Sequence, residues 1–103
     1  MRIFVDIDGT ICSIVKDGKY QDALPIIDHI DVLNKLYNKG HKITYWTARG
    51  TETGIDWREV TTTQLQTWGV KYHGLEFGKP TYDLFIDDKA YNAKSLSHLK
   101  GGD

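Results

Sequence analysis

Short apolar runs alternate along the chain with longer stretches in which apolar residues recur at helical spacing. The β-branched and aromatic runs at residues 3–8, 43–46 and 82–86 predict three strands. Residues 70–77, where charged and apolar positions interleave, predict a further strand at a sheet edge. Four strands separated by helical stretches are therefore expected.

Two amphipathic helices are predicted between these strands. The first follows Pro25, which suits a first helical turn, and carries an apolar stripe before it ends near Gly40. The second begins at Asp56, which lies three residues before Glu59 in a capping-box arrangement, and continues to residue 68. The order of elements is thus strand, helix, strand, helix, strand, strand.

Such alternation predicts an α/β fold with a parallel sheet, in which ligands bind beyond the carboxyl ends of the strands. Residues 11–24, called the flap below, show weak alternation about Asp17 and Gly18 and predict a short hairpin. A short helix is expected within residues 93–99, followed by a frayed tail. The 103 residues suffice for one domain, spanning residues 1–103.

Composition narrows the class of protein. With 40% hydrophobic and 26% charged residues, the chain is typical of globular proteins. Its net charge of -1 gives little electrostatic attraction to nucleic acid or anionic membranes, so neither is expected as a partner. The single cysteine, Cys12, suits a reducing compartment. Because no signal peptide or apolar run of ~18 residues is present, we expect a cytoplasmic location.

Polar residues follow several of the predicted strands. Asp6 and Asp8 share one face at the end of the first strand, and Gly9 permits a sharp exit. Two carboxylates roughly 4 Å apart repel by about 4 kcal/mol at an effective dielectric constant near 20, which calls for a cation or a raised pKa. An isolated Asp-x-Asp-Gly is more often a simple turn. The side chains expected to meet at this edge are those of Asp6, Asp8, Thr47, Lys79, Asp87 and Asp88.

This set of oxygen ligands with one ammonium group suits Mg²⁺ and a phosphate group. The sequence has no glycine-rich phosphate loop, no His and Cys cluster for zinc, and no Gly-x-Ser-x-Gly nucleophile elbow. A carboxylate is therefore expected to act as the nucleophile or the base.

The ordered motifs resemble those of the haloacid dehalogenase superfamily of aspartate-nucleophile phosphatases. The similar segments, in order, are residues 6–10 (DIDGT), Thr47, residues 78–80 (GKP) with Lys79, and residues 86–88 (IDD). The resemblance covers nearly the whole chain and implies a Rossmann-like, three-layer core with a short flap and no cap domain. Residues 45–50 (YWTARG) and 77–80 (FGKP) further resemble small capless members associated with capsule and surface-polysaccharide biosynthesis.

The resemblance implies an Mg²⁺-dependent phosphatase in which Asp6 forms an aspartyl-phosphate and Asp8 is the general acid and base. It also implies that Thr47 and Lys79 hold the phosphate oxygens. The implied metal ligands are Asp6, Asp8 through its backbone carbonyl, Asp87 and Asp88. For Asp88 the resemblance implies either binding of the metal through water or orientation of Lys79. The implied substrate-binding residues are Gly9, Thr10, Ala48 and Arg49.

Several alternatives stay open on the sequence. Arg49 either contacts substrate, so that its removal raises KM selectively, or forms a surface ion pair. The missing cap is replaced either by the flap and residues 49–57 or by a second subunit in a homo-oligomer. The expected substrate is a small phosphorylated metabolite, with a sugar phosphate favoured. A receiver-like phospho-aspartate domain and a non-catalytic scaffold are the alternatives to a phosphatase.

Overall fold

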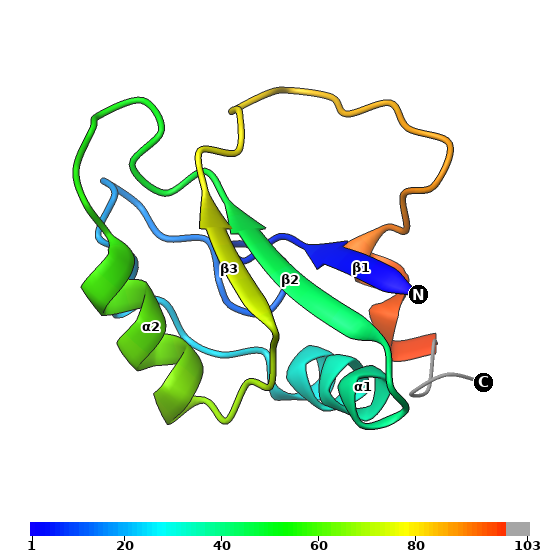
Figure 1. The fold of residues 1–103 in the computed structure, drawn as a ribbon. Helices are drawn as coiled ribbons and strands as arrows, with labels where there is room; N and C mark the ends of the chain where they lie inside the picture. The colour runs from blue at the N-terminus through cyan, green and yellow to red at the C-terminus, as the bar shows by residue number, and fades with distance from the viewer. Residues whose placement is uncertain (99–103) are drawn as a thin grey trace.

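A three-stranded parallel sheet forms the centre of the computed structural model, which describes residues 1–98 (Figure 1). Its strands are β1 (Arg2–Val5), β2 (Lys42–Thr47) and β3 (Gly74–Phe77), in the spatial order β1-β2-β3. In register, Val5 lies opposite Tyr45, and Thr47 lies opposite Phe77. The carboxyl ends of all three strands therefore meet at one edge of the sheet.

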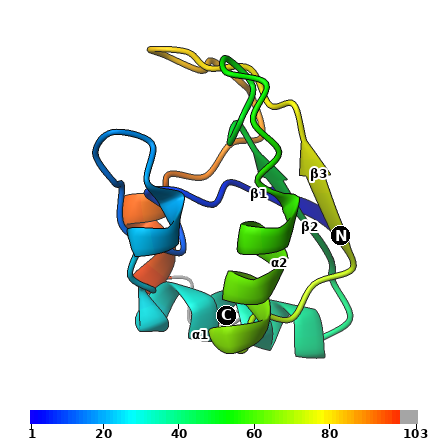
Figure 2. The same cartoon turned by 90° about the vertical axis from the view of Figure 1, so that its left-hand side faces the viewer.

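Two helices connect the strands, α1 (Ile27–Asn38) and α2 (Arg58–Thr67). Because consecutive parallel strands lie side by side and such crossovers are right-handed, both helices belong on the same side of the sheet. Figure 2 shows them there. Residues 1–98 thus form a small α/β domain of two layers, which differs from the expected arrangement of three.

The core lies between the sheet and these helices. Alternate residues of β2, Ile43 and Tyr45, point into it and are fully buried, together with Leu65 of α2 and Leu33 of α1. The opposite face of the sheet carries Phe4, which is 59% exposed and packs edge to face on Trp46. One face of the sheet is therefore the core face, as alternation along each strand requires.

The strand expected at residues 82–86 is not formed. The chain from residue 78 to residue 92 runs as an irregular connection over the carboxyl edge of the sheet (Figure 1), and Leu84 and Ile86 are 75% and 88% exposed. A strand needs a backbone partner, and among residues 1–98 β1 pairs with β2 alone. Residues 82–86 therefore lie apart from the sheet, and within residues 1–98 the outer edge of β1 stays unpaired.

The flap is also not a hairpin. It turns at Asp17 and Gly18, which both have positive φ, and then forms the 3₁₀ helix η1 (Tyr20–Asp22). The N–H of Ser13 donates to the carbonyl of Leu24, and the N–H of Leu24 donates to the hydroxyl of Ser13, which closes the base of the flap. The flap is therefore a closed loop without strands of its own.

Other elements lie close to their predicted positions. The helix α1 begins two residues after Pro25, and the N–H of Ile26, its N-cap residue, donates to the carbonyl of Ile11. The oxygen of Asp56 accepts a hydrogen bond from the N–H of Arg58 at the start of α2, while no reciprocal bond from the expected capping box is formed among the described residues. The 3₁₀ helix η2 (Ala93–His98) occupies the place of the last predicted helix, whose final residue and the tail lie outside the described residues.

Within residues 1–98, no helix has both the length and the apolar character needed to cross a membrane.

Candidate active site

A tight turn after β1 places two carboxylates at the carboxyl edge of the sheet. The N–H groups of Thr10 and Ile11 both donate to the carbonyl of Ile7, at 3.0 and 2.9 Å. Gly9 adopts a φ of 82°, a conformation that glycine accepts without strain. Because Ile7 is buried in the core, Asp6 and Asp8 on either side of it are held at the sheet edge.

Lys79 is the cation beside Asp6. Its Nζ lies 3.5 Å from Oδ1 of Asp6, and it also donates to the hydroxyl of Tyr82 at 3.2 Å. Burial raises the pKa of the Asp6 carboxyl, and the nearby Lys79 charge opposes that rise. The side chain of Asp6 is 38% exposed, so this carboxylate is open to solvent on one side.

The end of β2 holds Lys79 in this position. The N–H of Lys79 donates to the carbonyl of Thr47 at 3.1 Å, and its carbonyl accepts from the hydroxyl of Thr51 at 2.8 Å. Thr47 is fully buried, and its hydroxyl accepts from the N–H of Arg49. The structure therefore brings Thr47 to the site as predicted but encloses it, where it fixes the connection that follows β2.

Arg49 is the cation beside Asp8. Its Nε lies 3.0 Å from Oδ2 of Asp8, and its Nη2 lies 2.9 Å from Oδ1, a two-bond pairing of guanidinium with carboxylate. Its other N–H groups are directed to Thr61 and Gln64 of α2 and to the sulfur of Cys12. The residue is only 2% exposed. The ion pair of Arg49 is therefore buried, and does not lie at the surface as one of the two expectations had it.

The protein itself thus supplies one cation to each of the two neighbouring carboxylates. Lys79 faces Asp6 and Arg49 faces Asp8. These pairings offset the repulsion that the sequence implied, without a bound ion.

The predicted metal centre is not assembled. Asp87 and Asp88 are exposed in the irregular connection after β3. In the described part of the chain, no group of three or more His, Cys, Asp and Glu side chains is placed to hold a metal ion. Asp6 and Asp8 remain at the edge, and each already faces a cation of the protein. The arrangement therefore does not fit an Mg²⁺ ion held by all four predicted carboxylates.

The remaining predicted substrate-binding residues lie around the same edge. Gly9 is exposed, and Ala48 is half-buried with its carbonyl accepting from the N–H of Thr51. The carbonyl of Thr10 accepts a hydrogen bond from Nδ1 of His29 at 2.6 Å. Of these three, Gly9 offers the most open surface to a ligand.

Sequence patterns did not reveal the four side chains that surround Arg49, which are Cys12, Tyr20, Thr61 and Gln64. Burial raises the pKa of the Cys12 thiol to about 12, and the Asp8 charge adds to that rise. The Tyr20 ring lies 4.8 Å from the guanidinium carbon of Arg49. No local signal marks these residues, because they meet Arg49 only in the folded chain.

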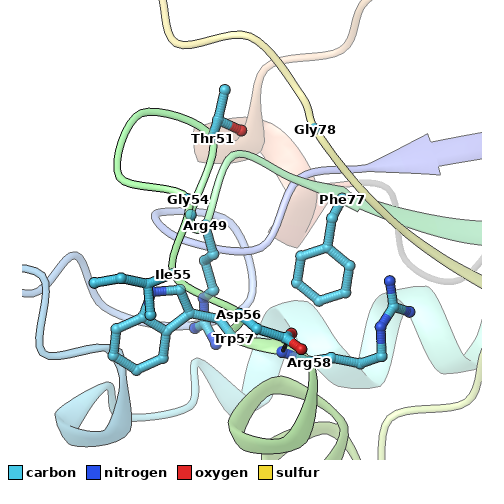
Figure 3. Close-up of a pocket in the computed structure, with 10 residues that line it drawn as sticks. Arg49, Thr51, Gly54, Ile55, Asp56, Trp57, Arg58, Phe77 and Gly78 are labelled. Atoms are coloured by element: carbon cyan, nitrogen blue, oxygen red, sulfur yellow. Dashed lines mark hydrogen bonds between the residues drawn. The ribbon is translucent and has the colours of Figure 1, made fainter.

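A pocket of about 220 Å³ lies next to this edge, between residues 49–58 and the end of β3 (Figure 3). Phe77 forms one wall, with the guanidinium of Arg58 4.7 Å above its ring. Trp57 lies at the opposite side and packs edge to face on Tyr20. Thr51, which also lines the pocket, is hydrogen bonded to Lys79 and so joins the pocket to the carboxylate edge.

Fold and site together define a small α/β domain with two carboxylates, each matched by a basic side chain, at the ends of parallel strands. No protein-family model and no curated protein matches the chain. A crystal structure of a Vibrio cholerae protein, described as a target without a functional name, is similar with a TM-score of 0.85. It is 27% identical, and the match covers 93% of this chain and 86% of that chain.

Proposed function

We propose that the protein is a phosphatase that hydrolyses a small phosphomonoester, with a core of the haloacid dehalogenase type and Asp6 as its nucleophile. The observation that carries this proposal is the Asp6 carboxylate, partly exposed at the carboxyl edge and 3.5 Å from the Lys79 ammonium. A solvent-accessible carboxylate beside a fixed cation can approach a phosphoryl group, whose negative charge the cation would attract.

The proposed reaction has two displacements. In the first, an oxygen of Asp6 bonds to phosphorus while the bond between phosphorus and the ester oxygen breaks. Asp8 gives a proton to that leaving oxygen, which departs as an alcohol. In the second, Asp8 takes a proton from water, the water oxygen bonds to phosphorus, and the Asp6 carboxylate is released with inorganic phosphate.

Lys79 has two roles in this scheme. Its charge favours the ionised form of Asp6, which is the form that attacks phosphorus, and it stabilises charge on the phosphoryl oxygens. Thr47 would contribute indirectly, because its carbonyl fixes the backbone of Lys79 and its hydroxyl fixes the backbone of Arg49.

Mg²⁺ belongs to the proposal through the resemblance of the acidic motifs, and the geometry of residues 1–98 does not supply its site. Binding by Asp6, Asp8, Asp87 and Asp88 together requires the connection after β3 to move toward β1. No step of the scheme above is assigned to the ion.

The pocket beside the site supports a sugar phosphate as substrate. Phe77 and Trp57 offer aromatic surface, while Thr51 and Asp56 offer polar groups, a combination that suits a hydroxylated ring. In this scheme the loop of residues 49–57 replaces part of a cap. Completion of the site by a second copy in a homo-oligomer is the alternative source of enclosure.

A screen of the full chain against phosphorylated sugars, nucleotides and other small phosphate esters, with and without Mg²⁺, tests the proposal. We expect repeated turnover on at least one ester, and no phosphate release by the Asp6→Asn variant. Absence of turnover on every ester, or equal release by Asp6→Asn, would contradict it.

One observation favours a second candidate, a receiver-like phospho-aspartate domain. Both oxygens of Asp8 accept hydrogen bonds from Arg49, and a receiver, unlike a phosphatase, does not require Asp8 to transfer protons. A receiver would accept one phosphoryl group from a small donor such as acetyl phosphate and then stop. A phosphatase releases many equivalents of phosphate per protein, so the stoichiometry of phosphate release separates the two.

A further inference from the structure

We propose that Arg49 is a positioning residue that fixes the Asp8 carboxylate and ties the flap to it, and that its side chain does not contact substrate. The catalytic part of this inference rests on the proposed phosphatase function. The tie between flap and carboxylate does not, because it is a property of the folded chain.

The contacts of the guanidinium account for all of its hydrogen-bonding capacity. An arginine side chain has five N–H donors. Nε and Nη2 each donate to one oxygen of Asp8, and the second N–H of Nη2 is directed to Sγ of Cys12 at 3.8 Å. The two N–H groups of Nη1 donate to Thr61 at 3.0 Å and Gln64 at 2.6 Å. With every donor used and 2% of the residue exposed, nothing is left to bind a ligand.

The pairing with Asp8 determines where that carboxylate points. Two parallel N–H···O bonds fix both the plane and the direction of the carboxylate, which a single contact would not do. The side chain of Asp8 remains 21% exposed, so its outer side still faces the site. Arg49 thus holds the group that the proposed reaction uses for proton transfer.

The same guanidinium is joined to the flap. Its central carbon lies 4.8 Å from the centre of the Tyr20 ring, within the range of a cation–π contact. The Nε2 of Gln64 donates to the carbonyl of Tyr20 at 2.7 Å, while Oε1 of the same amide accepts from Arg49. Tyr20 also packs on Trp57, with the ring centres 4.9 Å apart. Arg49, Gln64 and Tyr20 therefore form one connected group that links Asp8, α2 and η1.

Removal of the guanidinium has two expected consequences. Asp8 loses its only salt-bridge partner among residues 1–98 and becomes free to change direction. The flap loses the cation under Tyr20, and the Gln64 amide loses one of its two partners. Catalytic turnover and flap order should therefore change together.

The experiment compares Arg49→Ala and Arg49→Lys with the wild-type chain. A lysine keeps the charge but cannot form the planar, two-bond contact, so both variants should lower kcat by about a hundredfold. KM should stay within about twofold of the wild-type value for two esters that differ in their leaving group. Amide hydrogen exchange in residues 13–24 should become about tenfold faster or more. Arg2→Ala, an exposed arginine at the start of β1, is the matched control and should change neither measurement.

A variant outside the ion pair separates the two parts of the inference. Gln64→Leu removes the bonds to Arg49 and to the Tyr20 carbonyl and leaves the Asp8 pairing in place. We expect faster flap exchange with most of kcat retained, and this test remains available if Arg49→Ala does not fold.

Two results would overturn the proposal. A selective rise in KM for one ester in Arg49→Lys, with unchanged flap exchange, would place Arg49 on the substrate. Unchanged flap exchange in Gln64→Leu would show that the group does not tie down the flap. If the wild-type chain hydrolyses no ester, the phosphatase proposal fails, while flap exchange in the same variants still decides the structural part.

Discussion

The ammonium of Lys79 lies 3.5 Å from the carboxylate of Asp6, which joins the connection after β3 to the end of β1. The strand β2 between them holds Lys79 in place, because the carbonyl of Thr47 accepts a hydrogen bond from the N–H of Lys79. A parallel sheet thus brings together two charges that are distant in the sequence, at the edge where such folds bind ligands.

Lys79→Met should lower kcat/KM by about a hundredfold or more, because the phosphoryl group loses the cation that faces it and Asp6 loses the charge that favours its ionised form. Steady-state kinetics on the best ester measures the loss. Lys42→Met, at the exposed start of β2, serves as the control. Wild-type kinetics in the Lys79→Met enzyme would show that Lys79 has no role in catalysis.

Tyr45→Phe should stabilise the protein by about 1 kcal/mol, since the buried Tyr45 hydroxyl has no hydrogen-bond partner among the described residues. Urea unfolding measures the change in the free energy of unfolding. Tyr72→Phe is a suitable control, because the half-buried Tyr72 packs edge to face on Tyr45. A less stable Tyr45→Phe protein would indicate that a bound water satisfies the hydroxyl.

Because of the Cys12 thiol, we expect the free energy of unfolding to fall in alkaline solution. Burial raises its pKa from 9.0 to about 12, so the folded state holds this proton more tightly than the unfolded state. The resulting stabilisation is complete below pH 9 and is lost as the pH rises toward 12. Cys12→Ala should lack this part of the decline in chemical unfolding measured across that range. Parallel curves for the two proteins would show that the thiol is not held in its neutral form.

Mg²⁺ should stabilise the protein if the acidic motifs bind it, by about 2.7 kcal/mol at 100 times its dissociation constant. Such binding requires residues 82–88 to approach β1, so Mg²⁺ should also slow amide exchange in that segment. Phe4, exposed on β1, offers apolar surface for the contact. Both effects should be absent in Asp87→Asn. No change of Tm or exchange on addition of Mg²⁺ to the wild-type chain would remove the ion from the proposal.

Most of the framework could be predicted from the sequence, because local patterns specify it. The alternation in β2 and the apolar stripe of α1 each identify a buried face without knowledge of the partner. Residues 82–86 show the limit of this reasoning, since their apolar character indicates a strand while pairing depends on an edge elsewhere in the chain.

The site, like the fold, could be predicted from the sequence only in part. The positions of Asp6, Asp8 and Lys79 follow from the rule that ligands lie at the ends of parallel strands. The burial of Arg49 does not, because it results from acceptors on two separate segments, Asp8 after β1 and the side chains of Thr61 and Gln64 on α2. A charged residue after a strand is consistent with a surface position as well as with a buried pair, and only the tertiary structure distinguishes the two.

The central claim, that Asp6 carries the phosphoryl group, is tested most directly by trapping the intermediate. The full chain is mixed with an ester that it hydrolyses, and the reaction is quenched in acid. Reduction with borohydride then converts an aspartyl-phosphate to homoserine. Mass spectrometry of the peptide that contains residues 3–10 should then show homoserine at position 6 and unmodified aspartate at position 8. Homoserine at another position, or sustained phosphate release by Asp6→Asn, would contradict the account.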